Sequence, residues 1–72
     1  MKFSTKFEST SGERKDCIST LDADEIATVE RVRRIKGNEV AGITAAALVL
    51  KSVYTELDAI EWNHMGAPEP MN

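Results

Sequence analysis

The sequence predicts an α+β fold dominated by helix, with an N-terminal β-hairpin followed by two antiparallel helices (ββαα), the second longer than the first. Near the N-terminus, apolar and polar side chains alternate with the period of a strand. Two later segments repeat apolar residues every three or four positions, which is the period of a helix. With 72 residues the chain is expected to form a single domain, 1–72.

The β-hairpin is predicted over about residues 2–21. Phe3 and Phe7 recur at even spacing among polar residues, and Ser11-Gly12 suits a turn because glycine tolerates positive φ. If these two residues form the whole loop, Phe7 lies opposite Asp16, and Phe3, Phe7 and Ile18 share one face.

The first helix is predicted over 22–36. Asp22 suits the N-cap, and Glu25 three residues later completes a capping-box pattern. Basic residues fill the last turn, where they favour the negative end of the helix dipole. Gly37 follows as the expected residue beyond the C-terminus.

The second helix is predicted over 39–64, and a flexible tail over 65–72, where a glycine and two prolines end the helical pattern. A broad apolar stripe along this helix is expected to form its core face. The stripe consists of Ile43, Ala46, Ala47, Leu50, Val53, Tyr54, Leu57 and Ile60.

The end of this long helix is the predicted interface with a partner or with a second copy. Antiparallel to a shorter helix, its last part extends beyond its neighbour and needs another cover. A weaker apolar strip ends at Trp62, a residue type enriched at binding hot spots. The alternative is that Trp62 folds back onto the hairpin or lies in a frayed helix end. The predicted interface residues are Leu48, Tyr54, Thr55, Leu57, Ala59, Ile60 and Trp62.

The sequence holds one cysteine, Cys17, and one histidine, His64. An intrachain disulfide is therefore impossible, and no zinc-site spacing is present. We expect no metal, no cofactor and no catalytic activity. Because a core of this size is only marginally stable, we expect a homodimer or a higher oligomer.

A cytoplasmic location and no membrane association are expected. The first ten residues lack the apolar stretch of a secretory signal. The longest near-apolar run, 41–50, is shorter than the roughly 20 residues that cross a bilayer.

A basic cluster near the end of the first helix could contact phosphate or nucleic acid. It consists of Arg31, Arg33, Arg34 and Lys36. The helix dipole and a solvated helix face explain it better. The net charge of −3, with only Lys51 basic after residue 38, argues against nucleic acid as the partner.

These observations favour a small, non-enzymatic interaction protein that binds and modulates another macromolecule, with inhibition as the expected effect. Small cofactor-free chains of this kind are common among phage and mobile-element accessory proteins, an analogy at the level of base rates. The expected partners are a second copy of the chain and an unidentified protein.

Two alternative functions stay open. The outline of residues 14–55, a strand and two helices joined at Gly37, is similar to that of ribbon-helix-helix DNA-binding dimers. That resemblance implies a repressor or an antitoxin, although Asp16 and Glu39 depart from the family's pattern. The other alternative is a small-ligand sponge built between subunits, with a site lined by Arg31, Arg34 and Tyr54.

Overall fold

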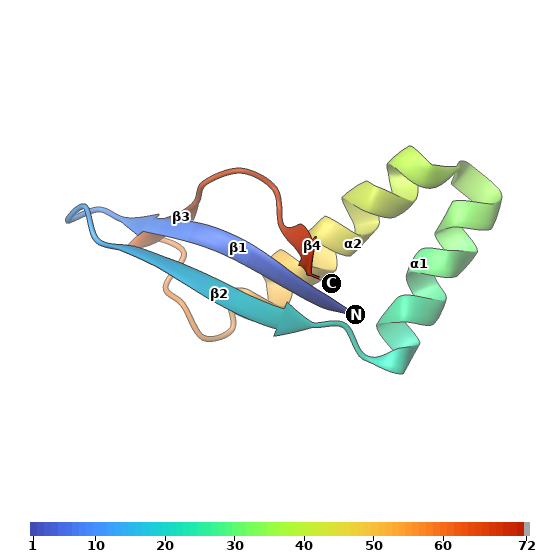
Figure 1. Cartoon of the computed structure of the whole chain (residues 1–72), viewed down its shortest axis with the longest axis horizontal. Helices are drawn as coiled ribbons and strands as arrows, with labels where there is room; N and C mark the ends of the chain where they lie inside the picture. Colours follow the sequence, from blue (N-terminus) through green and yellow to red (C-terminus); the bar gives the residue numbers. More distant parts are fainter. Residues whose placement is uncertain (72) are drawn as a thin grey trace.

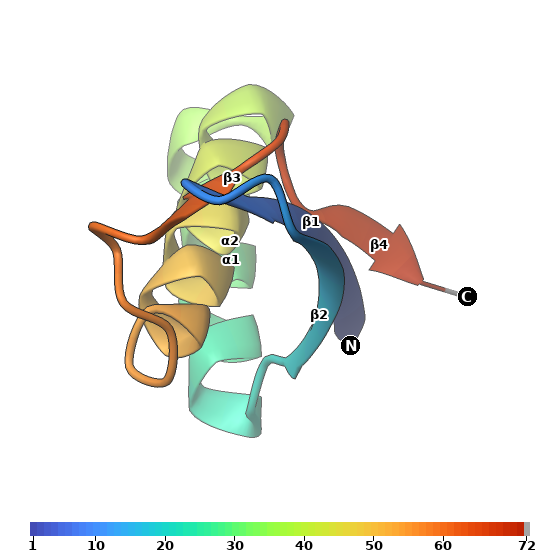
Figure 2. The ribbon, with the colours of Figure 1, turned by 90° about the vertical axis from the view of Figure 1, so that its left-hand side faces the viewer.

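The computed structural model describes residues 1–71 and has two layers, a mixed-length antiparallel sheet and a helical hairpin (Figure 1). The ββαα layout predicted from the sequence is confirmed, and two short strands follow it. The elements are β1 (Lys2–Ser9), β2 (Arg14–Thr20), α1 (Ala23–Lys36), α2 (Asn38–Val53), β3 (Trp62–His64) and β4 (Glu69–Met71). Figure 2 shows both helices on one side of the β1–β2 hairpin.

β1 is the central strand of the sheet. It pairs antiparallel with β2 along one edge, and with β3 and β4 along the other. β3 lies beside residues 7–9 of β1, and β4 lies beside residues 2–4. The two short strands therefore act as one interrupted edge. The turn of the hairpin projects beyond the helices, which gives the molecule its length of 42 Å against 22 and 20 Å (Figure 1).

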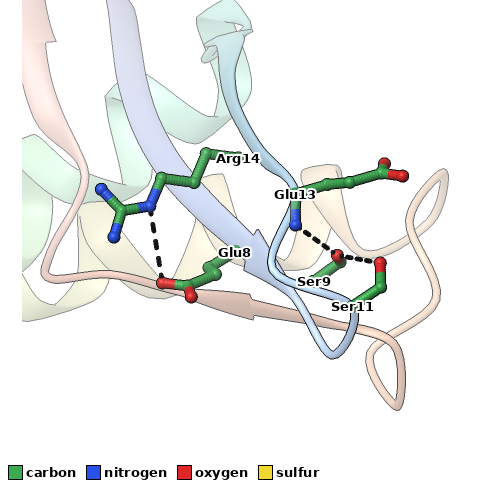
Figure 3. Close-up of polar contacts among 5 residues, drawn as sticks. All are labelled: Glu8, Ser9, Ser11, Glu13 and Arg14. Atoms are coloured by element: carbon green, nitrogen blue, oxygen red, sulfur yellow. Dashed lines mark hydrogen bonds and ion pairs between the residues drawn. The ribbon is translucent and has the colours of Figure 1, made fainter.

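The hairpin is confirmed, but its predicted register is wrong by one residue. Phe7 lies opposite Lys15, and Ile18 pairs with Ser4 on the sheet face that carries no helix. The loop spans residues 10–13 because Ser9 organises it: its Oγ accepts the backbone N–H of Glu13 at 3.0 Å and lies 2.9 Å from the Ser11 hydroxyl (Figure 3). A one-residue shift moves every side chain of a strand to the opposite face. Ile18 is consequently 61% exposed.

The first helix has the predicted bounds and the predicted cap. Asp22 accepts the backbone N–H of Glu25 at 2.8 Å, and Glu25 accepts the backbone N–H of Asp22 at 3.0 Å. Gly37 ends α1 at φ 93° and ψ 175°, a conformation that residues other than glycine rarely adopt. It leads directly into α2, so the two helices meet at a one-residue connection.

The second helix ends at Val53, so its predicted continuation to residue 64 is wrong. Tyr54 packs edge-on against Phe7 of β1, with ring centroids 5.6 Å apart, and its hydroxyl donates to the Trp62 carbonyl at 3.2 Å. The Asp58 carboxylate accepts the backbone N–H of Ile60 at 2.8 Å, which is a turn-forming contact. Pairing with β1 thus replaces the helical continuation.

Residues 69–71 were expected to belong to a flexible tail. They form β4 instead, with Phe3 opposite Pro70 and Ser4 opposite Glu69. Proline can occupy this position because β4 lies at an edge, where its missing N–H costs no ladder hydrogen bond.

The core lies between the sheet face that carries Phe3 and the inner faces of both helices. α2 buries Ala41, Ala45, Val49 and Val53, at a spacing of four. The predicted core stripe is therefore rotated, and Ile43 is exposed to solvent. The main cluster contains Phe3, Leu21, Val29, Ala41, Ala45 and Val49, with Ile26, Val32 and Leu48 packed against it.

Thr5 is a buried polar residue in this core, and replacing it is expected to stabilise the protein. It is 1% exposed, and its hydroxyl has no hydrogen-bond partner within residues 1–71. Thr5→Val keeps the branched shape and removes the unsatisfied hydroxyl, so we expect unfolding free energy to rise by about 1 kcal/mol. Urea unfolding measures it. Thr5→Ser, which keeps the hydroxyl and loses the methyl, should destabilise; a Thr5→Val variant no more stable than wild type would contradict the expectation.

Candidate interaction surface

Tyr54 and Trp62, both predicted to lie at an interface, are used within the fold. Tyr54 is half-buried against Phe7, and Trp62 is half-buried in β3 opposite Ser9. The Lys15 ammonium lies over the Trp62 ring, 4.5 Å from its centroid. The ring and the ammonium attract each other by a cation–π interaction. The alternative in which Trp62 folds back onto the hairpin therefore describes its position.

The other predicted interface residues do not form one helical strip, because α2 ends before most of them. Leu48 is half-buried beside the core cluster, and the Thr55 hydroxyl donates to the Ser52 carbonyl at 2.6 Å. Ala59 and Ile60 lie in the loop between α2 and β3, and Ile60 is 88% exposed. Leu57 is half-buried and lines a groove beside β2. The interface role of these residues, and of Tyr54 and Trp62, stays a prediction.

One exposed apolar feature is a helix face that the sequence pattern assigned partly to the core. Val40, Ile43 and Ala47 lie on the side of α2 about 170° from its buried residues, at 100° per residue. Ile43 is 64% exposed and Val40 is 40% exposed. We call these three residues the outer helix surface. Ile35, which is 69% exposed, lies at the same end of the helical hairpin, two residues before Gly37.

The signal for this surface is present in the sequence. Residues 40–50 contain no charged side chain, so α2 is apolar on both sides. A helix that is apolar all round is usually covered on all sides. Within residues 1–71, the sheet and α1 cover only one side.

The outer edge of β2 is the second exposed feature. No other strand of the described residues pairs with it. A groove of about 240 Å³ runs beside this edge, between β2 and the C-terminal end of α2. Its walls include Lys15, Cys17 and Ser19 from β2, and Val53, Glu56 and Leu57 from the other side. The groove thus combines apolar and charged side chains with unpaired backbone.

The four basic residues of α1 are exposed but do not form one patch. Arg31 and Arg34 project from one side of the helix, and Arg33 and Lys36 from roughly the opposite side, at 100° per residue. Arg33 also forms a salt bridge with Glu30. A phosphate on either side of α1 could therefore contact two of these basic side chains, but not all four.

The three residues predicted to line a small-ligand site, Arg31, Arg34 and Tyr54, do not lie together within one chain. Tyr54 lies at the C-terminal end of α2 against β1, whereas Arg31 and Arg34 lie in the half of α1 that leads to Gly37. Because the helices are antiparallel, these positions lie toward opposite ends of the helical hairpin (Figure 1).

The described residues were also compared with the requirements of a metal site and of a membrane-spanning helix. Within residues 1–71 no three His, Cys, Asp or Glu side chains are grouped so that they could hold a metal ion. Cys17 is half-buried, and His64 Nδ1 lies 3.0 Å from the Gly66 carbonyl oxygen. Over the same residues, no helix has both the length and the apolar character needed to cross a bilayer.

Comparisons of the chain with models of known protein families, with curated proteins and with solved structures give no match.

Proposed function

We propose that this chain is a non-enzymatic interaction protein of the cytoplasm that binds another protein through the outer helix surface and inhibits it. The supporting observation is α2 itself: a helix with a buried apolar face on one side and Val40, Ile43 and Ala47 exposed on the other. Exposed apolar surface of this kind marks sites of protein association.

The character of the surface favours a protein partner over nucleic acid. Residues 40–50 offer no charge for a phosphate, and the basic residues of α1 project from two sides. An amphipathic helix or an apolar patch of a target could lie against the outer helix surface with helix-in-groove or helix-on-helix packing. Small inhibitory proteins of phages and mobile elements provide the functional analogy.

Ile43→Glu is expected to weaken target binding, because it places a carboxylate at the centre of the outer helix surface. Burying an isoleucine contributes about 1.5–3 kcal/mol, so affinity should fall by roughly ten- to a hundredfold. Wild type and variant are used to capture partners from the native cell, with mass spectrometry and a nucleic-acid assay on the eluate. The Kd is then measured with the purified captured protein, and its activity is assayed with and without the chain.

Ile60→Glu distinguishes the outer helix surface from the interface that the sequence predicts around Ile60, because Ile60 is equally apolar and more exposed but lies outside the helices. It should leave the Kd unchanged, and circular dichroism should show the same helicity for all three proteins. Equal binding by wild type and Ile43→Glu would refute the assigned surface. An eluate that contains nucleic acid and no enriched protein would refute the proposed class of partner.

A further inference from the structure

We infer that β2 is a dimerisation strand: two copies of the chain pair their β2 strands antiparallel across a two-fold axis at Cys17, which joins the two sheets into one. The inference concerns a surface separate from the outer helix surface and does not depend on the proposed target.

The two edges of the sheet are built differently. The β3–β4 edge consists of two strands of three residues each, and one of them contains Pro70. Short strands and proline are ways in which proteins block an edge against further pairing. The β2 edge runs for seven residues without proline. It is therefore the edge that can accept another strand.

The backbone groups on this edge can be assigned from the ladder with β1. Leu21 N–H donates to the Met1 carbonyl, and Ser9 N–H donates to the Glu13 carbonyl, so odd-numbered residues of β2 face β1. Because an antiparallel strand alternates its bonding direction, the even-numbered residues present N–H and C=O groups outward. These residues are Arg14, Asp16, Ile18 and Thr20.

Charge and the number of paired residues together select the register. The helices of both copies lie on the same side of the joined sheet only under one condition. Each β2 residue must lie opposite a residue of the partner subunit that belongs to the same face of β2. Axes at Lys15 or at Asp16 would oppose two like charges, which is unfavourable. The axis at Cys17 pairs all seven residues and opposes no like charges. It places Asp16 opposite Ile18 of the partner subunit, and Arg14 opposite Thr20 of the partner subunit.

The size of the chain provides a reason for the dimer. Small domains without a disulfide or a metal gain stability by association, and the sequence has a single cysteine. Pairing would satisfy the outward backbone groups of β2. It would also cover the groove between β2 and α2, where Val53 and Leu57 contribute apolar surface.

The first experiment measures the oligomeric state of the full chain by light scattering and sedimentation over a concentration series, under reducing conditions. Wild type should be a dimer. Ile18→Pro removes an outward N–H without touching the β1 ladder, and should raise the dimer dissociation constant at least about tenfold. Ile18→Ala, which keeps the N–H, should remain largely dimeric. Circular dichroism identifies any variant that fails to fold.

The second experiment tests the register without changing the backbone. Ile18→Asp brings a carboxylate opposite Asp16 of the partner subunit on both sides of the axis, and should dissociate the dimer. Adding Asp16→Lys converts each repulsion into an ion pair and should restore it. In wild type, mild copper-phenanthroline oxidation should join the two Cys17 thiols, which lose two protons and two electrons to the oxidant. Non-bonded antiparallel pairs hold their Cα atoms about 4.5 Å apart, within the span of a disulfide.

Three results would overturn the inference. A wild type that stays monomeric at every concentration excludes the dimer. A dimer that Ile18→Pro and Ile18→Asp leave intact uses a different surface, and loss of that dimer in Ile43→Glu would identify the outer helix surface instead. A dimer that is neither cross-linked at Cys17 nor restored by the Asp16→Lys and Ile18→Asp combination excludes the register.

Discussion

Phe7→Ala should lower the free energy of unfolding by about 3–5 kcal/mol. Phe7 is fully buried at the centre of β1, with Lys15 opposite it in β2 and His64 opposite it in β3. Its ring also supports Tyr54 in an edge-on contact, with an interplanar angle of 89°. Removing the ring opens a cavity beneath the residue that ends α2, and the Tyr54 ring loses its aromatic partner.

The consequence should be severe because the protein is small. At 0.05–0.15 kcal/mol per residue, a chain of this length has about 4–11 kcal/mol of stability in total. Urea unfolding followed by circular dichroism measures the loss, with all variants at one protein concentration because a dimer would make stability concentration-dependent. Phe7→Leu retains most of the volume and should cost less than about 1.5 kcal/mol. Equal stability of Phe7→Ala and Phe7→Leu would show that the ring is not a core element.

The two long N-terminal strands and the first helix were predictable because their signals are local. The capping box of Asp22 and Glu25 and the terminal Gly37 set the bounds of α1, and both act through hydrogen bonds between residues close in sequence. The alternation around Phe3 and Phe7 identified β1 for the same reason. The register was not predictable from it, since it depends on the hydrogen bonds that the Ser9 side chain makes in the loop.

The C-terminal third was mispredicted because its structure is decided by distant contacts. Residues 54–64 have an apolar spacing that suits a helix, and isolated propensity favours that outcome. In the fold, Trp62 lies opposite Ser9, and Met65 N–H donates to the Lys6 carbonyl at 2.7 Å. Strands of three residues have too little pattern to be recognised without knowledge of the strand they pair with.

For the candidate interaction surfaces too, local sequence signals predict the element but not the contacts that orient it. The uncharged stretch 40–50 predicts an apolar helix. It does not predict which side of that helix faces the core, because both sides are apolar. Ala41 and Ala45 are buried, and Ile43 is exposed, since small residues allow α2 to approach its neighbours closely. The larger side chain is therefore left on the outer helix surface, where it can contribute more to binding than alanine could.

The orientation of α2 is tested most strongly by moving one carboxylate between its two faces. Val49→Asp places a charge at a fully buried position among apolar core residues. Burying an unpaired charge costs several kcal/mol, so we expect Val49→Asp to be largely unfolded in dilute buffer at 25 °C. Ala47→Asp, two residues away on the exposed side, should lose only about 0.7 kcal/mol through helix propensity.

Far-ultraviolet circular dichroism and urea titration of both variants read out this difference directly. The two substitutions introduce the same side chain and the same charge into the same helix. Their helix-propensity costs differ by less than about 1 kcal/mol, so burial is the main variable. If α2 instead lay with the predicted stripe of Ile43, Ala47 and Leu50 against the sheet, Ala47→Asp would be the disruptive change and Val49→Asp the mild one. A folded Val49→Asp together with an unfolded Ala47→Asp would therefore reverse the assignment of the core face and of the outer helix surface.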